Sequence, residues 1–192
     1  MAHLSTEQIT ERVADLPPAP TDNGVVATLL IRPETNVRKI VSTFHVVPGE
    51  GIVGDNYVAR GDRKTPDGKA HPEGQVCIMN ASILDILADG DTNKWELAGD
   101  QILADFDLST DNLPAGTRFS IGSATFEVSN KPHNGCAKFA DRFGMDASRF
   151  SNSDKTKRYR GINLMVVTEG DVSVGDVITK LEETGNGSFP PA

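Results

Sequence analysis

The chain has 192 residues, 38% of them hydrophobic and 24% charged, which suits one globular domain with a sizeable core rather than two. Its formal net charge of −8 argues against a general nucleic-acid or anionic-membrane binder, although a local basic patch could hold a small anionic ligand. The sequence has no membrane-length apolar run, no secretory signal and only two cysteines, so we expect a cytoplasmic protein with reduced thiols.

The first 23 residues predict an N-terminal helix followed by a stiff linker. Ser5 and Gln8 have the spacing of a capping box, and apolar residues recur on one face as far as Leu16. The proline-rich residues 17–20 end the helix. From Gly24 onward the pattern becomes that of β-structure.

Residues 24–182 predict a single β-rich domain. Gly122-Ser123 predicts a hairpin turn, and short helices are expected over residues 80–88, with Asn80 as N-cap, and 136–143, closed by Gly144. About seven to nine strands and three short helices, without strand–helix alternation, predict a mostly β fold with peripheral helices, a closed or nearly closed β-barrel. The tail, residues 183–192, is rich in Gly, Ser and Pro and is expected to be disordered. Runs rich in β-branched and aromatic residues predict strands over residues 25–31, 39–47, 75–79, 101–106, 117–121, 124–128, 162–168 and 176–181.

Residues 49–74 form a long polar stretch with several glycines and basic side chains. A loop of this length inside a compact domain is functional or mobile. We expect it to lie over a ligand pocket, because Arg60 and Arg63 would have no evident purpose elsewhere.

Cys136 is the residue that most suggests chemistry. Asn134 can act as an N-cap, which would put Cys136 in the first turn of the following helix. There the unpaired backbone N–H groups and the helix dipole favour an anion, and so the thiolate. The thiolate is both the nucleophile and the metal ligand, so Cys136 is a candidate reactive cysteine. Basic side chains close by in sequence add to this effect: Lys131, His133, Lys138 and Arg142.

Structural interpretations of the cysteines stay open beside this one. Cys136 could be a small buried residue at a strand–helix junction, its basic neighbours being solvated surface. Cys77 lies in the apolar run 75–79 with no charged residue near it in sequence, so we expect it to pack in the core.

Other ligand patterns are weaker. His133 and Cys136 have a two-residue gap, and His45, His71 and Cys77 could complete a zinc site, but no second ligand pair shows metal spacing. We expect His45 to be a strand residue that faces polar partners. Asp55 and Asp100 both follow glycine, where aspartate is common because it hydrogen-bonds its own turn.

Several ordered pieces of the chain resemble the MOSC domain, named for the C-terminal domain of molybdenum-cofactor sulfurase. Together they span about residues 24–182. The segment most specific to the family is Pro132-His133-Asn134-Gly135-Cys136, which matches its single cysteine, followed by Arg160-Gly161-Ile162 and the run to Gly175-Asp176. The other pieces are the glycine–aspartate turn at 51–55, Gly99-Asp100-Gln101 where many members carry Gly-Glu-Asn, and the hairpin at 113–124.

The resemblance implies a β-barrel in which Cys136 ligates molybdenum or carries sulfur. In the first case a basic pocket would hold the phosphate of a molybdopterin, and the chain would be a molybdenum-dependent oxidoreductase that reduces N-hydroxylated compounds with electrons from a partner reductase. Arg158 or Arg160 would pair with the phosphate, and Lys131 and His133 would bias Cys136 toward thiolate; Asn134 and Arg60 are the other expected cofactor contacts.

In the second case Cys136 would accept sulfur as a persulfide from a sulfur-donor protein, and the chain would be a sulfur transferase that needs no metal. A third hypothesis is a non-catalytic ligand-binding or interaction barrel in which Cys136 is structural. No nucleic-acid or membrane partner is expected under any of the three.

Overall fold

The computed structural model describes residues 3–182 and contains eleven strands and five α-helices within them; the tail expected to be disordered lies outside this range. The helices are α1 (Thr6–Ala14), α2 (Tyr57–Arg60), α3 (Ala81–Leu87), α4 (Ala137–Phe143) and α5 (Met145–Ser151), with one 3-10 helix, η1 (Thr92–Ala98). The strands are β1 (Gly24–Ile31), β2 (Lys39–Val41), β3 (Thr43–Val47), β4 (Gly51–Ile52), β5 (Val76–Asn80), β6 (Ile102–Asp105), β7 (Arg118–Ile121), β8 (Ala124–Val128), β9 (Ile162–Thr168), β10 (Gly170–Ser173) and β11 (Val177–Lys180).

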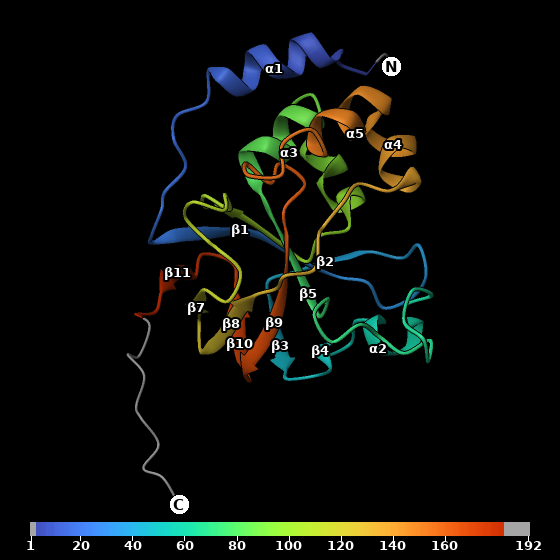
Figure 1. Cartoon of the computed structure of the whole chain (residues 1–192), viewed down its shortest axis with the longest axis vertical. Coiled ribbons are helices and arrows are strands. Elements are labelled where there is room, and N and C mark those ends of the chain that lie inside the picture. The colour runs from blue at the N-terminus through green and yellow to red at the C-terminus, as the bar shows by residue number, and fades with distance from the viewer. Residues whose placement is uncertain (1–2, 183–192) are drawn as a thin grey trace, which may run out of the picture.

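Seven strands close into a barrel, as the strand pattern predicts. Their order is β11-β7-β8-β9-β5-β6-β1, and pairing of β1 with β11 through Gly24 and Ile178 closes the ring. Closure satisfies the backbone groups that open edge strands would leave unpaired. Neighbours are antiparallel except β5 and β6, which are parallel and are linked through α3 and η1. Helices α1, α3, α4 and α5 gather at one end of the barrel (Figure 1).

The prediction of a single strand over residues 39–47 is wrong, because this run contributes to two sheets, the second of which has three strands. That run breaks at Ser42: β2 continues the barrel sheet beside β1, whereas β3 joins β10 and β4 in the small sheet. The carbonyl of Ser42 accepts a hydrogen bond from the backbone of Val174 at this switch. Strand β10, between β9 and β11, has no predicted counterpart, and neither do α2, α5 and η1, whose few residues carry too little periodicity to be recognised.

The local capping and turn predictions are confirmed. Ser5 and Gln8 form the capping box of α1 through both reciprocal hydrogen bonds. The side chain of Asn80 accepts from the backbone of Ile83 and so caps α3. Strands β7 and β8 pair as a hairpin around Gly122-Ser123. None of the described helices is long and apolar enough to cross a membrane.

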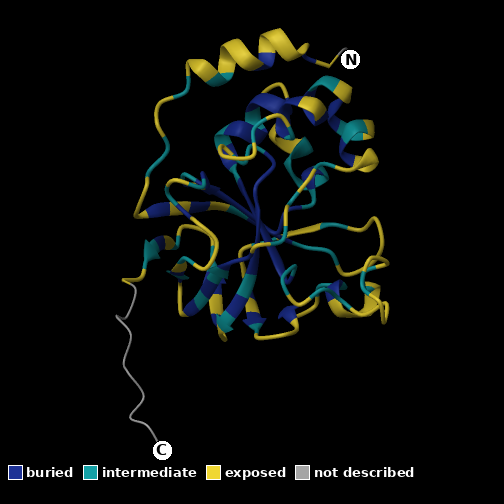
Figure 2. Cartoon of the chain, viewed as in Figure 1, coloured by how far each residue is buried: buried dark blue, intermediate teal, exposed yellow. Residues whose placement is uncertain are grey.

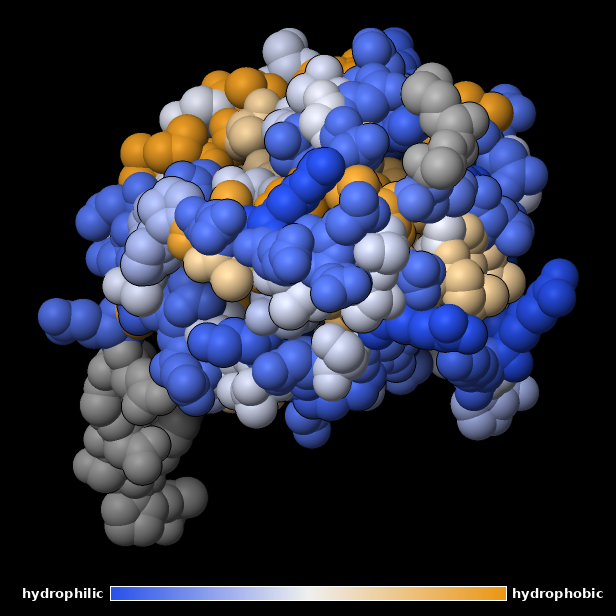
Figure 3. Space-filling model, turned by 90° about the horizontal axis from the view of Figure 1, so that it is seen from above, coloured by the Kyte–Doolittle hydropathy of each residue, from blue (hydrophilic) through white to orange (hydrophobic). Residues whose placement is uncertain are grey.

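The apolar residues form two cores, one inside the barrel and one under the helices. Strand alternation divides β5 between them: Val76 and Ile78 belong to the barrel core, whereas Met79 packs in the helical core. Cys77 therefore lies on the outer, helix-facing side of β5. Buried residues concentrate along the strands and the inner faces of the helices (Figure 2). Seen from the helical end, the surface is mainly hydrophilic with scattered hydrophobic patches (Figure 3).

Candidate functional site

Cys136 is exposed and stands at the start of a helix, although not where the sequence prediction placed it. Helix α4 begins at Ala137, so Cys136 is itself the N-cap and Asn134 is not. The Asn134 side chain accepts a hydrogen bond from Lys155 Nζ at 2.9 Å instead. The bend at Pro132 and Gly135 delays the helix, leaving the Cys136 thiol outside the first turn and open to solvent.

Cationic side chains surround the thiol. A pocket of about 230 Å³ contains Cys136, and Arg60 of α2 brings part of the 49–74 segment to it. One carboxylate, Glu34, also lines it. In a chain of net charge −8, this is a local concentration of positive charge. The six cationic residues among the lining are Arg32, Arg38, Arg60, Lys138, Arg142 and Arg160.

Two of these arginines are fixed by buried aspartates. Arg32 Nε lies 3.1 Å from Asp55 Oδ2, and Arg160 Nη1 lies 2.6 Å from Asp100 Oδ2; neither carboxylate is exposed. Asp55 also accepts from its own turn, as predicted, through the backbone of Tyr57. The expectation for Asp100 is wrong, because its recorded side-chain partners are far away in sequence.

Other polar atoms around the pocket have no partner among the described residues. They are Arg38 Nε, Arg160 Nε and Asn56 Oδ1, all buried. Burial, followed by the nearby guanidiniums of Arg142 and Arg32, lowers the pKa of Arg38. Unsatisfied buried donors and crowded cations are both costly. An anion with several acceptor oxygens would relieve both at Arg38 and Arg160, whereas Asn56 Oδ1 would need a donor.

The remaining predicted site residues divide between this pocket and its neighbour. His133, Asn134 and Arg160 line both the Cys136 pocket and a second cavity of about 360 Å³. Lys131 and Arg158 line the second cavity and are not among the residues around Cys136. Each is already engaged: Lys131 Nζ lies 2.8 Å from Asp62, and Arg158 Nη1 donates to the carbonyl of Leu113 at 2.6 Å.

Asp100 is the centre of a buried polar network behind the pocket wall. Its Oδ1 lies 2.8 Å from His133 Nε2, while its Oδ2 pairs with Arg160. The Arg160 guanidinium lies 4.6 Å from the centre of the Phe139 ring and donates to the carbonyl of Ala98. Burial alone would raise the pKa of Asp100, but Arg160 and His133 lower it below its usual value. Asp100 therefore holds two of the groups that line the pocket.

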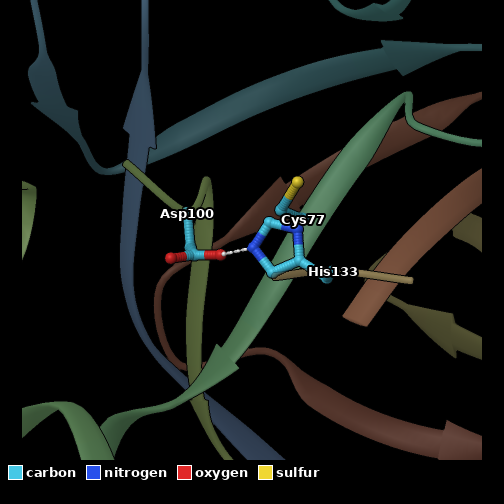
Figure 4. A group of neighbouring side chains, drawn as sticks. All are labelled: Cys77, Asp100 and His133. Carbon is cyan, nitrogen blue, oxygen red and sulfur yellow. Dashed lines mark hydrogen bonds and ion pairs between the residues drawn. The ribbon is translucent and has the colours of Figure 1, made fainter. Parts of the chain in front are cut away.

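Cys77 joins this network, although its neighbours in sequence do not indicate it. It is buried, as predicted. No charged residue is near it in sequence, but two ionisable side chains are near it in the fold: ligand-type atoms of Cys77, Asp100 and His133 all lie within 4.8 Å of one another (Figure 4). His45 lies elsewhere, 2.8 Å from Asp171, and so faces a polar partner as expected. The one available clue was strand alternation, which puts Cys77 on the opposite face of β5 from Ile78.

Comparisons with known proteins agree with this architecture. A family model described as the MOSC domain matches residues 65–179, and no curated protein matches the sequence significantly. The fold is similar to that of the YuaD protein from Bacillus subtilis, with a TM-score of 0.63 and 17% identity over 81% of this chain and 94% of that chain. It is also similar to YiiM from Escherichia coli (TM-score 0.54, 18% identity, 84% of this chain and 72% of that chain) and YiiM from Geobacillus stearothermophilus (0.52, 14%, 86% and 76%). At these identities the likeness concerns the fold alone.

Proposed function

The chain belongs to the MOSC domain family, and from this premise we propose that the cationic pocket at Cys136 binds the phosphate-bearing end of a molybdenum cofactor. The observation that carries the proposal is that six cationic side chains line the same pocket as an exposed thiol. A molybdopterin joins an anionic phosphate to a soft metal centre, and this pocket pairs guanidiniums with a thiol. Arginine suits phosphate because its fork donates two parallel hydrogen bonds, and thiolate suits soft metals.

The arginines divide into two roles. Asp55 and Asp100 hold Arg32 and Arg160 in fixed positions, so these two shape the wall. Arg38 and Arg60 have no ion pair within residues 3–182, and Arg38 also carries an unused Nε–H donor. We assign phosphate binding mainly to Arg38 and Arg60, with Arg160 turning its free Nε–H to the same anion. His133 and Asn134 complete the wall beside Cys136.

Cys136 would provide the sulfur ligand. A bound molybdenum centre would supply two-electron redox chemistry at this position, and the substrate class that we propose is N-hydroxylated compounds, with electrons from a partner reductase. The exposure of Cys136 leaves it open to substrate and to a protein partner. Such chemistry needs a reduced thiol, which a cytoplasmic setting maintains.

The same exposure favours a second function, sulfur transfer. As a thiolate, an accessible cysteine in a cationic pocket can attack the outer sulfur of a donor protein's persulfide. A new S–S bond forms on Cys136, the donor's S–S bond breaks and the donor leaves as a thiolate, so no metal or further oxidant is needed. Peptide mapping after treatment with a sulfane-sulfur donor should place the added sulfur on the Cys136 peptide. The adduct should be missing from that peptide in Cys136→Ser.

Molybdenum content tests the cofactor proposal directly. Protein produced in a host that makes molybdenum cofactor should carry molybdenum by elemental analysis, and Cys136→Ser should lose most of it. Arg118→Ala, which removes an exposed charge on β7, should retain it. If neither molybdenum nor a sulfur adduct is found on the folded wild-type chain, the non-catalytic barrel becomes the better description.

Retention of the cofactor should depend on Arg38 and Arg60, two of the three pocket arginines that have no ion pair within residues 3–182; the third, Arg142, donates to the carbonyl of Leu97. Arg38→Ala and Arg60→Ala should each weaken retention about tenfold or more, because a charge-assisted hydrogen bond is worth about 1.5–3 kcal/mol. The measurement is molybdenum remaining after dialysis at increasing salt, with Arg118→Ala as control. Equal retention by all three variants would place the phosphate outside this pocket.

A further inference from the structure

The second cysteine, Cys77, lies in a setting unlike that of an inert core thiol. It is 6% exposed and faces away from the barrel interior, towards the loop that carries His133. The imidazole of His133 lies beside both Cys77 and the carboxylate of Asp100 (Figure 4). A thiol, an imidazole and a carboxylate placed this close together are the groups that activate a cysteine nucleophile.

The charges that face Cys77 are mainly positive. They come from His133, from Arg32 after β1 and from Arg60 of α2; Asp100 is the opposing negative charge. Burial alone would raise the pKa of the Cys77 thiol, but His133 and then Arg32 lower it below its ordinary value. In the same way, burial would lower the pKa of His133, but Cys77 and Asp100 raise it to about 9.

The hydrogen-bonding groups around the Cys77 sulfur include one acceptor for a thiol and one donor without a partner. As a thiol, Cys77 Sγ donates to Asn163 Oδ1 at 3.3 Å, and Asn163 is oriented by donating its own Nδ2 to the carbonyl of Lys131. Gln101 accepts from the Cys77 backbone through Oε1, while its fully buried Nε2 has no partner in residues 3–182. The Gln101 amide, which is bound to the backbone of Cys77, therefore has an unpaired N–H donor that could bind an acceptor.

These observations favour a negatively charged sulfur over a metal ion at this cluster. Cysteine, histidine and aspartate could ligate zinc. However, Asp100 is already shared between Arg160 and His133, and a cation would be repelled by the guanidiniums of Arg32 and Arg160. The Cys77 thiolate, the His133 imidazolium, the Asp100 carboxylate and the Arg160 guanidinium are together neutral without any added ion, and Arg32 is offset by Asp55.

We propose that Cys77, His133 and Asp100 form a second thiol centre, separate from Cys136, in which the Cys77 thiolate reacts with small neutral peroxides. Such a reagent suits a thiol with little exposed surface. His133 lies beside the sulfur and supplies a proton to the leaving group, whereas Asp100 is a positioning residue that acts through His133.

The step balances with hydrogen peroxide as the oxidant. The Cys77 thiolate attacks one peroxide oxygen, an S–O bond forms and the O–O bond breaks, giving a sulfenic acid, Cys77–SOH. The departing hydroxide takes the proton of the His133 imidazolium and leaves as water. Sulfur is oxidised by two electrons and the peroxide is reduced by two.

The test uses the full chain carrying Cys136→Ser, so that Cys77 is the one remaining thiol of the two in the sequence. The protein is treated with hydrogen peroxide, the sulfenic acid is trapped with dimedone, and the rate is followed by intact mass across pH. Adding His133→Gln should slow trapping at neutral pH about tenfold or more, because the thiolate fraction falls. The matched control is His45→Gln, an exposed histidine also paired with an aspartate, which should change nothing.

The ultraviolet absorbance of thiolate gives an independent readout if His133→Gln does not fold. In the Cys136→Ser protein this absorbance should already be present near neutral pH, which is below the ordinary pKa of a thiol, about 8.5. Absorbance that rises only above that range would overturn the proposal, as would one equivalent of tightly bound zinc that is lost in Cys77→Ser. Because Cys136 is absent throughout, these outcomes leave the proposed function of Cys136 unaffected.

Discussion

Replacing Asp100 with asparagine should lower the free energy of unfolding by about 3–5 kcal/mol, the cost of removing one partner from a buried ion pair. Asp100 is fully buried and lies 2.6 Å from the guanidinium of Arg160, whose side chain is 8% exposed, so Arg160 would be left as an uncompensated charge away from water. The measurement is urea unfolding at neutral pH. The matched control is Asp89→Asn, which breaks an exposed pair with Arg12 and should cost within about 1 kcal/mol.

The stability that Asp100 contributes should depend on pH. Burial raises the pKa of Asp100 in the folded chain, but Arg160 and His133 lower it by more, so that it lies below its usual value. A carboxyl with a lowered folded pKa contributes stability above its unfolded pKa of about 3.9, and that contribution is lost as the pH falls through the lower folded pKa. The difference in stability between wild type and Asp100→Asn should therefore shrink on acidification below about pH 4. A difference that is constant with pH would contradict the ion-pair explanation.

Replacing Gly161 with alanine should destabilise the barrel by more than about 3 kcal/mol, because backbone cannot move aside as a flexible side chain can. Gly161 has φ +89°, and an added Cβ would stand 2.2 Å from the carbonyl oxygen of Ile78 and 3.1 Å from Met79 Cα. Both contacts are with the backbone of β5, the strand that carries Cys77. The same substitution would also disturb Arg160, its neighbour in sequence.

Gly116→Ala separates the steric effect from the conformational one. Gly116 has the same φ of +89°, but an added Cβ would meet nothing within 4 Å. Its cost should be only that of a left-handed backbone in a non-glycine residue, about 1–2 kcal/mol. Thermal and urea unfolding of the two variants should differ accordingly, and equal destabilisation would show that β5 yields to the added methyl group.

Local rules explain the parts of the fold that could be predicted from sequence. Alternation of apolar residues located most barrel strands, Asn80 and the Ser5–Gln8 pair marked two helix starts, and Gly122-Ser123 marked a hairpin. Local rules failed where a segment changes partners. The 39–47 run is continuous in composition, but its two halves pair with β1 and β10, and the choice depends on strands distant in sequence.

The barrel class and the choice of Cys136 could be predicted from the order of residues alone, because periodicity, glycine turns and clustered basic residues are properties of neighbouring positions. Which side chains from distant segments come together is known from the folded chain. The pairing of β5 with β6, and of β5 with β8 through β9, brings ligand atoms of Cys77, Asp100 and His133 within 4.8 Å of one another. The segment after β1, together with α2, adds Arg32 and Arg60. Their charges act through distance and burial, which no spacing along the chain encodes.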